Sequence, residues 1–164
     1  MIFEMTTFTF VHVVLSLVGI CSGILVVIGL INAKPLQIWT GVFLASTVAT
    51  SVTGFLFPFE HFTRGHGVGI VSLVVLAAAI LARYSFHLAG AWSQIYAVSA
   101  VIALYLNVFV LVVQLFQKVS ALKVMAPTQS EPPFLVTQLV LLVLFVMFAF
   151  AAVRRSRIKP VRTA

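Results

Sequence analysis

The chain has 164 residues, of which 62% are hydrophobic and 8% are charged, and its formal net charge is +7. A soluble domain is about half apolar and a quarter charged, so the composition excludes an ordinary soluble protein and predicts an integral membrane protein whose main partner is the lipid bilayer. The positive charge does not indicate a nucleic-acid partner, because no interleaving of aromatic and basic residues and no recognised binding motif accompanies it.

Half of the basic residues follow directly after the last apolar segment. Such a cluster is typical of a cytoplasmic membrane anchor, and it predicts contact with anionic lipid head groups. The five residues are Arg154, Arg155, Arg157, Lys159 and Arg162.

Five apolar segments are each long enough to cross a bilayer as a helix. The sequence therefore predicts an all-α membrane protein, a single domain formed by one compact bundle of five transmembrane helices. A cleavable secretory signal requires basic residues before its apolar segment. The first apolar segment has no Lys or Arg before it, so we expect it to be retained as a span. The expected spans are residues 8–31, 36–57, 68–89, 92–118 and 134–153, and a basic tail follows at 154–164.

The first span carries small and polar residues on one helical face, namely His12, Ser16, Gly19 and Gly23. Gly19 and Gly23 form a G-x-x-x-G motif, which lets another helix approach closely. We expect this face to pack within the chain, with a dimer interface as the alternative. Cys21 is the only cysteine, so no internal disulfide can form.

The second span is rich in hydroxyl side chains. Serine and threonine can donate to carbonyls of their own helix, so such a run survives in lipid without other partners. A closely packed Ser/Thr helix is the favoured interpretation, and a polar wall facing a cavity is the alternative. The residues concerned are Thr40, Ser46, Thr47, Thr50, Ser51 and Thr53.

Two other positions have structural interpretations. Arg83 and His87 lie among aromatic residues at the end of the third span, and this grouping is typical of a head-group belt rather than a catalytic site.

In the longest loop, Ser130 and Glu131 precede two prolines. Ser130 is expected to be an N-cap, and Glu131 favours the positive end of a helix dipole, so this sequence predicts a helix start.

The fourth span contains the apolar stretch Tyr96 to Lys118, which carries two amides, Asn107 and Gln114. They are seven residues apart and share one helical face. Because hydrocarbon offers an amide nothing to bond, this face must meet other protein, a cavity or a ligand.

The distribution of basic residues also predicts the orientation of the bundle. With the C-terminus in the cytoplasm, Lys34, Arg83 and the five tail residues are inside, while Arg64, Lys118 and Lys123 are outside. This excess predicts an N-terminus outside and a C-terminus inside.

In this orientation the outer half of the bundle receives most of the polar residues. Polar groups are costly in lipid and therefore mark a candidate site. The candidate ligand-binding residues are His12, Thr50, Asn107, Gln114 and Gln138.

Histidines near the same end also suggest a metal or haem site. His12 could act with His61 or His66, and Glu60 could be a ligand or could orient one. Imidazole and carboxylate are suitable ligands for such a centre.

Three functions are compatible with these residues. The favoured hypothesis is a non-catalytic accessory subunit or a module that binds a lipid or another apolar ligand, alone, as a homo-oligomer or in a larger membrane complex. The alternatives are a channel or transporter subunit lined by the second span and the Asn107–Gln114 face, and the metal or haem protein. An enzyme is the least favoured class, because no nucleophile elbow, metalloprotease motif, phosphate-binding glycine loop or CxxC motif is present.

Four segments carry a resemblance to a known group of proteins. They are TSVTGFLFPF at Thr50–Phe59, LARYSFHLAGAW at Leu81–Trp92, ALYLNVFVLVVQLFQKV at Ala103–Val119 and APTQSEPPF at Ala126–Phe134. In these segments the chain resembles a family of small, uncharacterised bacterial inner-membrane proteins. The resemblance implies a multi-pass protein of the bacterial cytoplasmic membrane, and it implies no activity or cofactor.

Overall fold

A computed structural model describes residues 7–57 and 64–157, and every regular element in these two ranges is helical. Five helical segments within them are long and apolar enough to cross a membrane. The elements are α1 (Thr7–Ile31), α2 (Gln37–Phe55), α3 (Arg64–Ile80), the π-helical turn η1 (Leu81–Ser85) that continues α3, α4 (Trp92–Lys118), the short α5 (Ser120–Met125) and α6 (Pro132–Arg157).

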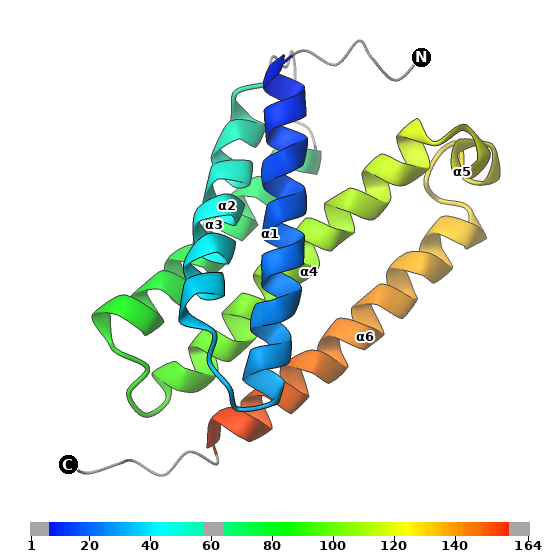
Figure 1. Ribbon diagram of the computed structural model, residues 1–164. Helices are drawn as coiled ribbons and strands as arrows, with labels where there is room; N and C mark the ends of the chain where they lie inside the picture. The colour runs from blue at the N-terminus through cyan, green and yellow to red at the C-terminus, as the bar shows by residue number, and fades with distance from the viewer. Residues whose placement is uncertain (1–6, 58–63, 158–164) are drawn as a thin grey trace.

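The long helices run alternately up and down between two ends of the bundle (Figure 1). We call the end where α1 begins the upper end and the end where α1 finishes the lower end, as they are drawn. Helix α4 packs against α1, α3 and α6, and α2 packs against α1 and α3. Helix α4 therefore joins the two parts of the bundle, with α1, α2 and α3 on one side and α6 on the other.

The closest approach of α1 to its neighbours is at Gly19 and Gly23. A Cβ on Gly19 would lie 3.1 Å from both Asn107 Nδ2 and Thr47 Oγ1, and a Cβ on Gly23 would lie 2.7 Å from Leu104 Cδ1 and 2.8 Å from the Phe43 ring. Small residues are used where helices need to approach this closely. The G-x-x-x-G motif therefore packs inside the chain, against α2 and α4, as the sequence predicted.

Helices α1 and α4 cross at these glycines and separate toward the upper end (Figure 1). The lower half is filled by a core that includes the fully buried Phe43, Leu76, Val101 and Leu104. Helix α6 lies on the other side of α4 and also contacts α1. The space between α1 and α4 is consequently closed below the crossing and wider above it.

The third span differs from the predicted range 68–89. Helix α3 begins at Arg64, and its π-helical continuation ends at Ser85. His87 and Leu88 have φ values of 49° and 58°, a left-handed conformation that a right-handed helix cannot include. The chain therefore turns before residue 89.

The loop between α4 and α6 also differs from its prediction, because it contains the helix α5. Before α6, the Glu131 carboxylate accepts hydrogen bonds from the backbone N–H groups of Thr128 and Ser130, both at 3.1 Å, and from the Thr128 hydroxyl at 2.8 Å. Desolvation raises the pKa of Glu131, but these hydrogen bonds outweigh it and hold the pKa below its ordinary value. Glu131 rather than Ser130 thus organises this turn.

The outer faces of the helices are apolar. Helix α6 in particular exposes a series of large side chains along its length, among them Leu139, Val143, Met147 and Phe150. A soluble monomer rarely exposes an apolar surface of this extent. These faces suit contact with acyl chains.

The glycine crossing leads to the first prediction. Gly23→Ala should lower the free energy of unfolding by about 1–3 kcal/mol relative to Gly41→Ala, because overpacking forces buried neighbours to move. The new methyl group would meet Leu104 and Phe43, which are buried, whereas a Cβ at Gly41 meets nothing within 4 Å. Unfolding by sodium dodecyl sulfate in mixed micelles measures both variants, and equal stabilities would contradict the close crossing.

Candidate functional site

A cavity of about 590 Å³ lies in the upper half of the bundle, between α1, α2, α3 and α4. Its lining residues on α1 and α4 lie above the glycine crossing, in the part of the bundle where these two helices separate (Figure 1). Pockets for small molecules commonly have volumes of about 300–1,000 Å³, so the cavity is large enough for a ligand.

Polar side chains reach the cavity from all four helices, while the rest of its wall is mainly aliphatic and aromatic. An apolar pocket with a few convergent polar groups is the usual form of a small-molecule site. The polar residues are Thr9, His12 and Ser16 on α1, Thr50 and Ser51 on α2, His66 and Ser72 on α3, and Asn107, Gln114 and Lys118 on α4.

The rim of the cavity is exposed between α1 and α4. Leu17 on α1 and Leu115 on α4 both line the cavity, and they are 45% and 40% exposed to the surroundings of the protein. Gln114 and Lys118, which also line the cavity, are exposed beside Leu115. By contrast, His66 and Ser72 on α3 are buried. The cavity is therefore deepest against α3 and opens sideways between α1 and α4.

Asn107 forms part of the floor of the cavity and is 9% exposed. Its Nδ2 donates a hydrogen bond of 3.5 Å to Thr47 Oγ1 on α2. Interhelical hydrogen bonds of this kind contribute about 0.6 kcal/mol on average, but an unpaired amide in an apolar interior costs more. The predicted polar face of α4 thus contacts another helix at Thr47, and it also lines a cavity.

Hydroxyl groups of α2 donate mainly to their own helix. Thr50 Oγ1 donates to Ser46 O at 2.8 Å, and Ser51 Oγ donates to Thr47 O at 2.9 Å. Both residues also line the cavity. The two interpretations of this helix are therefore compatible: its hydroxyls are satisfied internally, and the same helix forms one wall of the cavity.

His12 is held by a hydrogen bond from α1 to α2. Its Nδ1 lies 2.8 Å from Thr53 Oγ1, and that hydroxyl also lies 2.7 Å from Ala49 O, to which it donates. A hydroxyl has one proton to donate, so we infer that Thr53 Oγ1 accepts a hydrogen bond from His12 Nδ1–H. The neutral His12 then has an unprotonated Nε2. The imidazole also packs edge-to-face on Phe57, with ring centroids 5.1 Å apart.

His12 and His66 line the same cavity, from α1 and α3 respectively. Within residues 7–57 and 64–157, no group of three or more His, Cys, Asp or Glu side chains is placed to hold a metal ion. His61 and Glu60 lie outside the described residues. The metal or haem site therefore stays a prediction. The described residues place two of its candidate ligands, His12 and His66, on the wall of one cavity.

Gln138 does not join the other candidate residues. It is on α6, where its Nε2 donates to Phe109 O on α4 at 3.4 Å, and its Oε1 is buried without a hydrogen-bond partner in the structure. Helix α6 packs on the face of α4 that is turned away from the cavity. The sequence grouped Gln138 with His12 and Asn107 by depth along the bundle, and the structure does not place it on the wall of this cavity. Depth along the bundle does not determine which side of α4 a residue meets.

Lys118 was missed as a cavity residue in the sequence, although a signal for it exists. It follows Gln114 by four residues and Asn107 by eleven, which places all three on one face of a helix. Its ammonium group adds a positive charge near the rim. Of the predicted ligand-binding residues, the structure brings His12, Thr50, Asn107 and Gln114 to the cavity.

Comparison with known proteins adds no relative: no family model, curated protein or solved structure matches this chain.

The His12–Thr53 pair leads to the second prediction. Nitrogen-15 NMR of labelled protein should show His12 protonated at Nδ1 when neutral, because Thr53 Oγ1 accepts a hydrogen bond from that N–H group. Thr53→Val removes the acceptor and should shift the population toward the Nε2-protonated form, whereas Thr53→Ser should keep the Nδ1 form. An Nε2-protonated His12 in the unsubstituted protein would contradict the proposed direction of the bond.

Proposed function

We propose that this chain is a non-catalytic integral membrane protein that binds a membrane-soluble ligand in the upper cavity. The observation that carries the proposal is the cavity of about 590 Å³, lined by apolar side chains and by polar groups from four helices. In this proposal the ligand has an apolar body and a hydrogen-bonding head.

The membrane setting follows from the helices and the basic residues. Five helices are long and apolar enough to span a bilayer. The predominance of basic residues at the lower end supports an orientation with the C-terminus in the cytoplasm and the N-terminus outside. The resemblance to bacterial inner-membrane proteins supports a bacterial cytoplasmic membrane. In this setting the opening between α1 and α4 faces the acyl chains of the outer leaflet.

The donor groups of the cavity indicate the chemistry of the ligand head. Thr50 and Ser51 already donate to carbonyls of α2, so they can offer mainly oxygen lone pairs. Donors are available from Asn107, which has a second N–H, and from Gln114 and Lys118 at the rim. These groups suit a carbonyl or ester oxygen on an otherwise apolar molecule.

The shape of the cavity supports binding rather than passage through one copy of the chain. The cavity reaches down to Asn107, and the next turn of α4 carries Leu104, which is 1% exposed and packs in the core with the fully buried Phe43. A ligand that enters from the side therefore meets a closed floor.

Two matched variants give the third prediction. Val13 lines the cavity, while its neighbour Val14 is 41% exposed on the outside of α1. Val13→Phe should reduce cavity labelling by a photoactivatable fatty-acid methyl ester about tenfold or more, because the added ring occupies the binding space. Val14→Phe introduces the same ring at the lipid face and should leave labelling unchanged. Labelled peptides are mapped by mass spectrometry, with excess unlabelled ester as competitor.

The outcome separates a site from ordinary lipid contact. Saturable labelling of peptides from the cavity wall, lost in Val13→Phe alone, is the expected result. Labelling that is not competed, or that both variants reduce equally, would overturn the proposal. A visible absorption band or stoichiometric metal in the purified protein, lost in His12→Ala, would instead favour the metal or haem hypothesis.

A further inference from the structure

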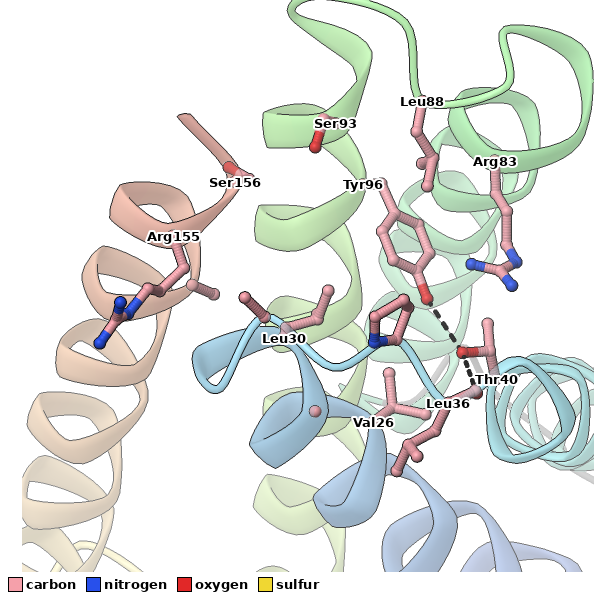
Figure 2. A pocket seen from close by; sticks show the side chains of 14 residues that line it. Val26, Leu30, Leu36, Thr40, Arg83, Leu88, Ser93, Tyr96, Arg155 and Ser156 are labelled. Carbon is pink, nitrogen blue, oxygen red and sulfur yellow. Dashed lines mark hydrogen bonds between the residues drawn. The ribbon is translucent and has the colours of Figure 1, made fainter. Parts of the chain in front are cut away.

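A second, smaller cavity of about 50 Å³ lies at the lower end of the bundle, between α1, α2, η1, α4 and α6 (Figure 2). About 10–15 Å³ of such space holds one water molecule, so this cavity admits a group of a few heavy atoms rather than a whole ligand. It shares no lining residue with the upper cavity.

Arg83 reaches this cavity from η1. Its guanidinium carbon lies 5.6 Å from the centre of the Tyr96 ring and 5.7 Å from that of Tyr84, within the range of a cation–π contact. A π-helical turn is an uncommon element that often occurs at functional sites. Here it is followed by the left-handed residues His87 and Leu88, so the backbone around Arg83 adopts two unfavourable conformations in succession.

The surface beneath the guanidinium is fixed. Tyr96 is 2% exposed, and its hydroxyl donates to Thr40 Oγ1 at 3.5 Å. Thr40 Oγ1 in turn donates to Leu36 O at 2.9 Å. In Figure 2 the Arg83 guanidinium lies beside these two hydroxyl groups and is turned toward them. The ring of Tyr96 is thus locked in place, and Arg83 is positioned over it.

Within residues 7–57 and 64–157, no carboxylate side chain lies beside Arg83. The chain has three acidic residues. Glu131 is at the upper end, and Glu4 and Glu60 lie outside the described residues. A half-buried guanidinium that has two aromatic contacts, and no carboxylate among the described residues, favours an oxyanion as its partner.

We propose that Arg83 and the small lower cavity bind a phosphoryl oxyanion, the rest of whose molecule lies outside the cavity. The planar guanidinium fork matches phosphate geometry, and Ser93 adds a hydroxyl at the cavity wall. The phosphodiester of a membrane lipid has the required chemistry, and so does free inorganic phosphate.

Arg155 is the other arginine of the cavity wall, but it is not the centre of this site. In Figure 2 its guanidinium points away from Tyr96 and Thr40, on the far side of the cavity. The neighbouring Arg154 is exposed and is not part of the wall. Arg154 therefore provides a control with the same charge at the same end of the bundle.

The fourth prediction tests this site with the purified full-length protein in micelles. Native mass spectrometry measures the affinity for dioleoyl phosphatidylglycerol and for dioleoylglycerol, which has the same chains without the phosphate. Arg83→Gln should weaken phosphatidylglycerol binding about tenfold, the size expected for losing a charge-assisted hydrogen bond. Arg154→Gln should weaken it less than about threefold, and Arg83→Lys should fall between the two.

The controls separate a built site from general surface charge. Equal losses in Arg83→Gln and Arg154→Gln would overturn the proposal, and so would equal binding of the two lipids together with no effect of inorganic phosphate on Tm. Thermal unfolding in millimolar inorganic phosphate identifies the source of the oxyanion: a rise in Tm that Arg83→Gln abolishes, without lipid preference, assigns the site to the free anion. If Arg83→Gln does not fold, Arg83→Lys retains the charge and the contact with Tyr96, and unimpaired phosphatidylglycerol binding by it would contradict the role of the guanidinium fork.

Neither the lipid-binding result nor the thermal-unfolding result tests the upper cavity, because Arg83 and Arg154 are both at the lower end of the bundle. A failure of this proposal therefore leaves the ligand-binding proposal standing, and the reverse also holds.

Discussion

The close crossing of α1 with α2 and α4 determines where this bundle is solid and where it is hollow. At Gly19 and Gly23 the absence of a side chain lets Asn107, Thr47, Leu104 and Phe43 pack against the backbone of α1. Two straight helices that touch at one level must separate on either side of it. Below the crossing the core fills the space, and above it the same divergence leaves the cavity between α1 and α4.

The polar groups at the glycine crossing and above it are arranged so that hydrogen-bond donors of one helix meet acceptors of another. Ser51 and Thr53 of α2 donate to carbonyls of their own helix, which leaves their oxygens as acceptors. Thr53 then accepts from His12 of α1, and Thr47 accepts from Asn107 of α4. Each bond is worth little by itself, but an unpaired group would cost more in the absence of water. The set therefore fixes the rotation of three helices about their axes.

Much of this arrangement could be predicted from sequence, because apolar length and helical spacing are local properties. They identified five helices long and apolar enough to span a membrane, with α4 at its observed bounds. They also placed Asn107 and Gln114 on one face of α4, which lines the cavity, with Asn107 buried and Gln114 exposed at the rim. The turn at His87 and Leu88 and the helix α5 were missed, since left-handed conformations and tertiary packing decide them. Gln138 does not line the cavity for a related reason: the sequence gives its depth along the bundle, but the side of α4 on which α6 packs is a tertiary property.

Volume alone is a weak argument for a ligand in a protein of this kind. An apolar cleft that opens to a bilayer can be filled by acyl chains, which replace the missing contacts at little cost, whereas the same cleft in water would be unfavourable. The polar groups are different, because acyl chains offer no hydrogen bond to Asn107, to Gln114 or to the unprotonated nitrogen of His12. A molecule that brings both an apolar body and an oxygen acceptor satisfies the wall and the amides together. The case for a ligand therefore depends on the pairing of these amides with an apolar wall rather than on the size of the space.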